Sequence, residues 1–175
     1  MRAAEYKNEL RELSRLAMPL AAAQAGTNLM GLVDVAVLGR LGAVELAGSA
    51  LANAIFFACS VTGMGMVMGV DPLISQAIGA GDRVRARHVL WQGIWLALVV
   101  AGVLTLVLLG AAAALPYIGA EPELLPPART FLLIRMLSLV PFLTFCALRS
   151  YLQSQGTTRP LLTSMIVANV ANFVL

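Results

Sequence analysis

Long apolar stretches, each with very few charged residues, follow one another along this 175-residue chain. They cover residues Leu16–Leu38, Leu46–Val70, Val89–Leu115 and Thr130–Leu152, and a fifth stretch begins at Leu161. The second stretch can continue to Ile78. Each of the first four exceeds the roughly 20 residues that an α-helix needs to cross about 30 Å of hydrocarbon. The pattern therefore predicts an all-α integral membrane protein, a bundle of about five transmembrane helices.

The two ends of the chain differ from these spans. Residues 1–15 mix acidic and basic side chains, and no small-residue cleavage site follows, so they predict a short amphipathic segment at the cytoplasmic interface rather than a secretory signal. The fifth span begins after Arg159 and Pro160 and stops 15 residues later, at Leu175. This length is too short for a full crossing. We expect the fifth helix to be incomplete and the sequence to be a fragment.

Composition supports a membrane protein. Charged residues make up 12% of the chain, against about 25% in an ordinary soluble domain, and the mean hydropathy is +0.85. The net charge of +3 is spread over loops, without a basic cluster interleaved with aromatics, which argues against nucleic-acid binding. Cys59 and Cys146 lack metal-ligand neighbours, and there is no nucleotide fingerprint or nucleophile–base pair. We expect no enzyme activity, no cofactor and no fixed metal site.

The distribution of cationic residues predicts the orientation. With the amino terminus inside, nine of the twelve Lys and Arg residues fall in inner segments and only Arg40 and Arg129 in outer loops, while Arg135 interrupts a span. An excess of positive charge marks cytoplasmic loops. We therefore expect a multi-pass protein of the inner, or plasma, membrane with a cytoplasmic amino terminus.

Asp34 is the only charged residue in the 23-residue stretch Leu16–Leu38. A carboxylate inside a bilayer costs several kcal/mol and usually faces a water-filled cavity or marks an ion pathway. Ala23, Thr27, Gly31 and Asp34 share one face of the predicted helix, small and polar enough to hold water or an ion. At about 1.5 Å per residue, Asp34 lies about 27 Å along the helix from Leu16. The alternative is an aspartate near the helix end that the outer headgroups hydrate.

Other interruptions of the spans leave alternatives open. Arg135 either extends toward the outer headgroups or neutralises a carboxylate in the same layer, with Asp34 the candidate. Pro19, Pro72 and Pro141 predict bends, which serve either static packing or a change of shape. Asp71 either bonds freed backbone beside Pro72 or pairs with an inner arginine. The glycine pair Gly65 and Gly69 predicts a close approach of two helices, and the segment 79–82 ends span two before an arginine-rich turn.

Three segments together resemble a known family. They are LAMPLAAAQAGTNLMGLVDVAVLGRLG in span one, SQAIGAGDRVRAR after span two, and LRSYLQSQGTTRPLLTSMIVANVANFVL around the fifth span. Their order and content are similar to the amino-terminal half of a multidrug and toxic compound extrusion (MATE) transporter. The resemblance runs through nearly all 175 residues.

The resemblance implies a fold and a function. Family members have twelve helices in two six-helix lobes, so residues 16–175 would be helices one to five of the first lobe, with helix six and the C-terminal lobe absent. They are antiporters that export amphipathic or cationic organic compounds in exchange for H⁺ or Na⁺. Asp34 matches the first-helix aspartate implicated in cation coupling, where Na⁺ would bind transiently, and Asn172 matches a polar residue of the fifth helix that cooperates with it. A lipid-linked oligosaccharide flippase of the same superfamily and a non-transporting helical membrane subunit are the alternatives.

Overall fold

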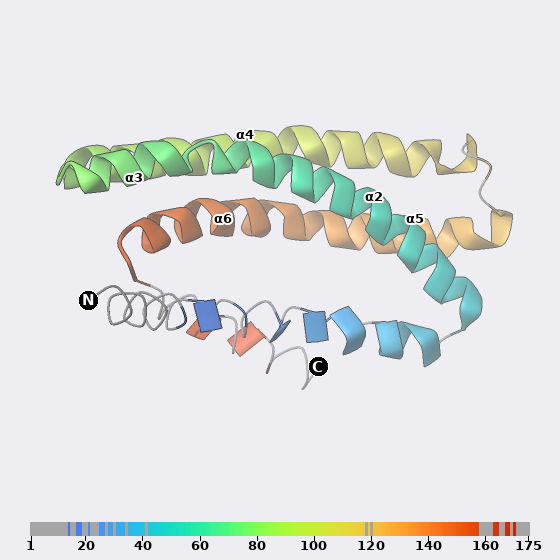
Figure 1. The fold of residues 1–175 in the computed structure, drawn as a ribbon. Coiled ribbons are helices and arrows are strands. Elements are labelled where there is room, and N and C mark those ends of the chain that lie inside the picture. The colour runs from blue at the N-terminus through green and yellow to red at the C-terminus, as the bar shows by residue number, and fades with distance from the viewer. Residues whose placement is uncertain are drawn as a thin grey trace, which may run out of the picture. The chain divides into compact units, whose positions relative to one another are not determined.

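The computed structural model describes the middle of the chain continuously and its two ends in short pieces. The described residues are 14, 17–18, 21, 25–26, 28–29, 31–33, 35–40, 42–117, 119, 121–157, 163–164, 167–168 and 170. The chain divides into two compact units, one formed by Leu38–Thr157 and the other by Met1–Val37 together with Thr158–Leu175. Every regular element assigned within the described residues is helical (Figure 1). The prediction of an all-helical fold is confirmed.

The unit Leu38–Thr157 contains three helical segments long and apolar enough to cross a membrane: Ala43–Gly79, Arg83–Tyr117 and Pro122–Ser154. The first is made of α2 (Ala43–Met68) and α3 (Asp71–Gly79), and the second of α4 (Arg83–Ala114) with the 3₁₀ turn η1 (Leu115–Tyr117). The third begins with the 3₁₀ turn η2 (Pro122–Leu124) and α5 (Leu125–Arg135). It continues through the 3₁₀ turn η3 (Met136–Ser138) into α6 (Leu139–Ser154). These three segments correspond to the second, third and fourth predicted spans.

The boundaries lie outside those predicted, because the helices extend beyond the apolar residues. Span two does continue past Val70, as far as Gly79. Span three begins six residues before Val89, at Arg83, since the side chain of Asp82 accepts a hydrogen bond from the Arg85 backbone N–H and caps the helix. The arginines after Asp82 therefore lie in α4 and not in a turn, which corrects the prediction. The turn itself is short, with Gly81 at φ 74°.

Two of the three segments are interrupted, and a proline stands just after each interruption. Gly69 and Val70 separate α2 from α3, and Pro72 occupies the first turn of α3. Met136–Ser138 forms the 3₁₀ turn η3, and Pro141 lies in the first turn of α6. A proline in the first turn costs little, because its missing N–H would have no intrahelical partner there. The interruptions that Pro72 and Pro141 predict are therefore present.

Small residues bring the helices of this unit together. A Cβ atom added to Gly48 would lie 2.8 Å from Pro127 Cγ and 3.0 Å from the Leu124 carbonyl oxygen, so α2 passes close to the start of α5. One added to Gly63 would lie 2.7 Å from Leu104 Cδ1 of α4. At Gly65 it would meet no atom of the described residues within 4 Å. Within the described residues the close approach therefore occurs at Gly48 and Gly63, and the predicted approach at Gly65 and Gly69 stays a prediction.

A constant separation of 79 residues relates the second and fourth spans. Ser150 and Ser154 bond Asp71 and Ser75, each pair 79 positions apart. The same separation joins Phe56 to Arg135 and Gly48 to Pro127. Two helices that keep one separation along their length run in the same direction and in register. This agrees with the predicted topology, in which spans two and four cross the membrane in the same sense.

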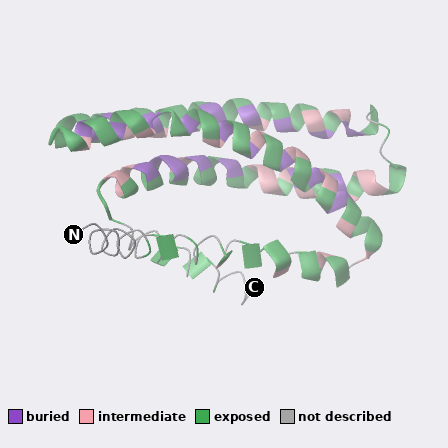
Figure 2. Ribbon diagram, in the orientation of Figure 1, coloured by how far each residue is buried: buried purple, intermediate pink, exposed green. Residues whose placement is uncertain are grey.

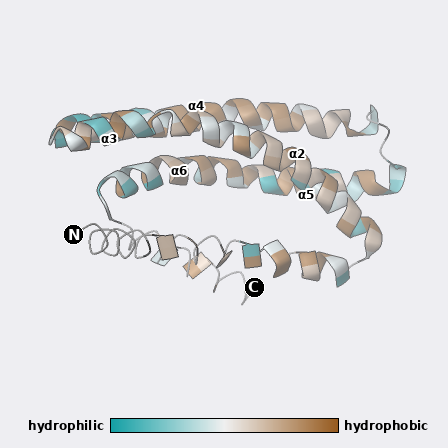
Figure 3. Cartoon of the chain, viewed as in Figure 1, coloured by the Kyte–Doolittle hydropathy of each residue, from teal (hydrophilic) through white to brown (hydrophobic). Residues whose placement is uncertain are grey.

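The interior of the unit is apolar, and so is most of its exterior. Buried side chains line the faces that α2, α4 and α6 turn toward one another (Figure 2). Large apolar side chains such as Trp95, Leu106 and Leu137 are 66% exposed or more, and apolar residues cover the middle of α4 (Figure 3). A soluble monomer rarely exposes so much contiguous apolar surface. Such an exterior is suited to contact with the hydrocarbon chains of a lipid bilayer.

Candidate functional site

The residues that flank Asp34 are helical. Residues 31–33 and 35–40 are in an α-helical conformation, as span one predicts. Asp34, Thr27, Pro19 and Asn172 lie outside the described residues. The segments that contain them, Met1–Val37 and Thr158–Leu175, belong to one compact unit.

Arg135, the candidate that the structure does describe, is the last residue of α5. Its guanidinium carbon lies 5.0 Å from the centre of the Phe56 ring and 5.6 Å from that of Phe131. A cation over an aromatic face gains about 0.5–2 kcal/mol, most where water is excluded. Its Nε is buried and has no hydrogen-bond partner among the described residues. Two rings, rather than a carboxylate of the described residues, therefore hold this charge.

A second buried polar atom lies one helical turn from Phe56. The Oγ of Ser60 is buried and, within the described part of the chain, has no hydrogen-bond partner. An unpaired buried polar group costs about 1–3 kcal/mol. Ser60 on α2 and Arg135 at the end of α5 therefore each place, in an apolar interior, a buried polar atom that has no hydrogen-bond partner among the described residues.

The hydroxyl of Ser150 on α6 donates a hydrogen bond to the carboxylate Oδ1 of Asp71 at the start of α3. One turn further, the hydroxyls of Ser75 and Ser154 are 3.1 Å apart. Neither alternative predicted for Asp71, a bond to freed backbone or a pair with an arginine, describes this contact. The two pairs fasten α3 to α6, so Asp71 serves packing in this unit.

Sequence reasoning missed the partners of these charged residues. Phe131 precedes Arg135 by four positions, a spacing that brings two side chains together on a helix, so that contact had a local signal. Ser150 and Ser154 show the same spacing on α6. Phe56 had no such signal, because it meets Arg135 only through the packing of α2 on α5. Among the described residues there is no group of three His, Cys, Asp or Glu side chains that could hold a metal ion.

The model of the MatE family matches residues 19–175 of the chain. The chain belongs to the MatE family. Similar proteins of this family include a probable multidrug resistance protein NorM from Synechococcus sp., which is 32% identical over 164 residues, 94% of this chain. The corresponding NorM proteins of Rhodopseudomonas palustris and Deinococcus radiodurans are 37% and 34% identical, over 93% and 85% of the chain.

The chain spans about a third of the length of these relatives, 35%, 34% and 33% respectively. The match to the MatE family confirms the resemblance identified from spans one, two and five. The relatives' names describe multidrug resistance and no catalysed reaction, in keeping with the expectation that this chain is not an enzyme. The apolar helices and the family together make it a multi-pass membrane protein.

Proposed function

We propose that residues 16–175 belong to the amino-terminal lobe of an antiporter that exports amphipathic or cationic organic compounds in exchange for H⁺ or Na⁺. The observation that carries this proposal is Asp34, the only charged residue of the apolar stretch Leu16–Leu38. An ionisable group inside a membrane span is costly and generally serves an ion or substrate pathway. The match of residues 19–175 to the MatE family includes this position.

In the proposed mechanism, Asp34 binds either the coupling ion or a cationic substrate. Binding of H⁺ or Na⁺ neutralises the carboxylate and weakens its attraction for the substrate, which then leaves. An ion can drive this change only if it binds the two conformations of the transporter with different affinity. Thr27 lies on the same predicted face as Asp34, and Asn172 matches the polar residue of the fifth helix that, by the family resemblance, cooperates with Asp34. Both are therefore assigned to the coupling site.

Arg135 and the prolines have supporting roles in this proposal. Arg135 is a second charge inside the apolar region, and its buried Nε has no partner among the described residues. It is therefore a candidate to contact an anionic or hydrogen-bond-accepting part of the substrate. Pro19 and Pro141 are assigned to helix bending, and Pro141 lies in the first turn of α6, just after the 3₁₀ turn η3. The conformational change would use these interruptions.

Replacement of Asp34 tests the proposal. In the complete natural polypeptide, reconstituted in liposomes, Asp34→Asn should abolish efflux of a cationic dye driven by a gradient of H⁺ or Na⁺. The amide keeps the size of the side chain but cannot exchange an ion. Circular dichroism should show unchanged helix content, because the substitution removes a costly charge from the span.

Asp71→Asn is the matched control, since an amide oxygen can still accept the bond from Ser150. This variant should keep gradient-driven efflux. Efflux by Asp34→Asn equal to that of the unmodified protein would refute the role of Asp34. Absence of driven efflux in the unmodified protein would instead favour a non-transporting subunit.

A further inference from the structure

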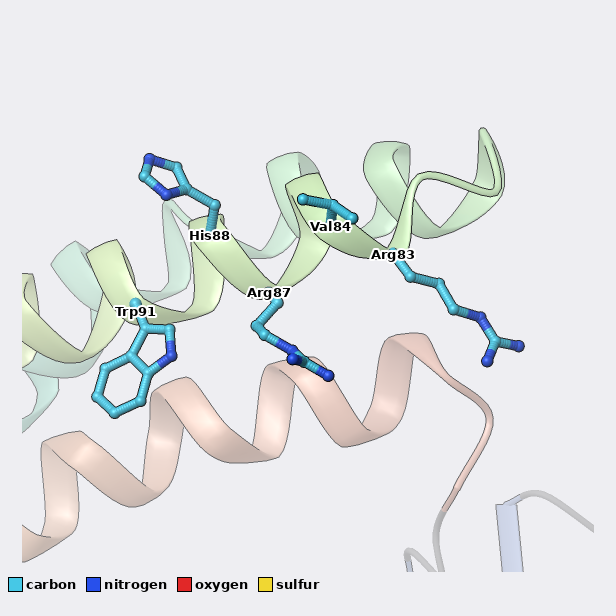
Figure 4. A pocket seen from close by; sticks show the side chains of 5 residues that line it. All are labelled: Arg83, Val84, Arg87, His88 and Trp91. Carbon is cyan, nitrogen blue, oxygen red and sulfur yellow. The ribbon is translucent and has the colours of Figure 1, made fainter.

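The exposed face at the beginning of α4 carries a feature that transport coupling does not use. A cavity of about 360 Å³ lies there, lined by Arg83, Val84, Arg87, His88 and Trp91 (Figure 4). At about 100° per residue, these positions fall within a single face of the helix. The buried residues Ala86 and Val89 point in the opposite direction. The cavity therefore opens on the side of α4 that faces away from the core of its unit.

Positive charge dominates this cavity. Arg83 and Arg87 follow one another by one turn and project from the same side of α4 (Figure 4). No acidic side chain is among the described residues that line it. Asp82, the nearest carboxylate along the chain, accepts a bond from the Arg85 backbone N–H instead. The Nε2 atom of His88 lies 3.1 Å from the Nε2 atom of Gln92. The two guanidinium groups are thus the charges that an incoming ligand would meet.

Aromatic side chains continue the same face into the apolar part of the helix. Trp91 lies one turn beyond Arg87, and Trp95 one turn beyond Trp91, with 58% and 66% of their surfaces exposed. They are the two tryptophans of the whole chain. Tryptophan is enriched where headgroups meet hydrocarbon. The face therefore changes over three turns from cationic, through amphipathic, to apolar.

We propose that this face of α4 binds an anionic phospholipid, with its phosphate between Arg83 and Arg87 and its acyl chains along Trp91 and Trp95. A guanidinium binds phosphate oxygens through paired hydrogen bonds. Basic pockets at the end of a membrane helix suit anionic headgroups. A soluble phosphate would use only the cationic half of the face. The exposed tryptophans account for a ligand that has an apolar part as well.

Fluorescence of the chain tests this proposal, because its tryptophans lie at the site. Trp95→Phe leaves Trp91 as the single reporter. The purified chain is reconstituted in phosphatidylcholine that contains a small fraction of brominated lipid, either phosphatidylglycerol or phosphatidylcholine. Two arginines should favour the anionic quencher over the neutral one by roughly 30-fold at low salt, from about 1 kcal/mol for each cation near the surface. Molar salt should remove most of this preference.

Two variants separate the site from general surface charge. Arg83→Gln with Arg87→Gln should reduce the preference to about one, whereas Arg85→Gln should keep most of it, since Arg85 is exposed but does not line the cavity. Both remove exposed charges, and circular dichroism checks that α4 still forms. Equal quenching by the two lipids in the Trp95→Phe chain that keeps all its arginines would overturn the proposal, and so would equal losses in the two arginine variants. Displacement of the anionic lipid by inorganic phosphate would assign the site to a soluble anion instead.

Discussion

Gly48 permits a close approach between α2 and the start of α5, because its missing side chain leaves room for the Leu124 carbonyl oxygen and for Pro127. One is a backbone atom and the other belongs to a proline ring, so neither can move aside as the end of a flexible side chain can. Gly63 has the same function against α4, but there the neighbouring atom is the end of a leucine side chain. The two positions differ in how well they would accept a methyl group.

Gly48→Ala should therefore destabilise the protein. Overpacking of a tight contact typically costs about 1–3 kcal/mol, and backbone neighbours favour the upper part of that range. Unfolding in detergent, followed by loss of helical circular dichroism, measures the change in the free energy of unfolding.

Gly65→Ala is the control, since its methyl group meets no described atom within 4 Å. It should leave stability unchanged or raise it by up to about 1 kcal/mol through helix propensity. Equal losses at positions 48 and 65 would show that close approach is not the reason for the glycine at 48. The sequence spacing selected the pair Gly65 and Gly69, whereas among the described residues the close contact of α2 with α4 is at Gly63. The sequence alone does not show which face α2 turns toward its neighbours.

At the scale of the helix, α3 depends on polar contacts with α6. Asp71 is half-buried and accepts its bond from Ser150, while Ser75 and Ser154 are a neutral pair nearer the end of the segment. Ser150→Ala leaves the Asp71 carboxylate without its donor, which typically costs about 1–3 kcal/mol. Native-state hydrogen exchange of the α3 amides should show this loss.

Ser154→Ala is the matched control on the same helix. It removes a neutral bond to Ser75, whose side chain is exposed, and should cost under about 1 kcal/mol. Faster exchange in Ser154→Ala than in Ser150→Ala would contradict the assignment of Asp71 as the stronger anchor.

The helices themselves could be predicted from the sequence, but only some of their first and last residues could. Apolar length alone identifies all three crossings of the central unit. The extension of α4 back to Arg83 had a local signal, the capping aspartate at position 82, which hydropathy does not measure. The 3₁₀ turn at Met136–Ser138 also has a local cause, the nearby Pro141. The bond from Ser150 to Asp71 had none, because it joins residues 79 positions apart.

At the scale of the whole unit, the parallel register of spans two and four can be tested covalently. In a chain with Cys59→Ala and Cys146→Ala, the pair Ser75→Cys and Ser154→Cys should form a disulfide on mild oxidation. The hydroxyl oxygens of Ser75 and Ser154 are 3.1 Å apart. Cysteine side chains at the same two positions are therefore close enough to form a disulfide. Mass spectrometry of the intact monomer detects the link.

The control pair, Gln76→Cys and Ser154→Cys, turns one cysteine about 100° around α3. It should remain reduced under the same conditions. Equal cross-linking of both pairs would mean that α3 and α6 slide or rotate against each other.

The candidate coupling site is a different case, since the sequence identifies Asp34, Thr27 and Asn172 and the described residues include none of them.

The separation of 79 residues between spans two and four also affects synthesis. At roughly 5–20 residues per second, a ribosome needs on the order of 4–16 s to make the partner of a newly inserted span two. During that time Gly48, Ser60 and Asp71 face lipid, α4 or the insertion machinery rather than α5 and α6. Insertion and final packing of this unit are therefore separate steps in time.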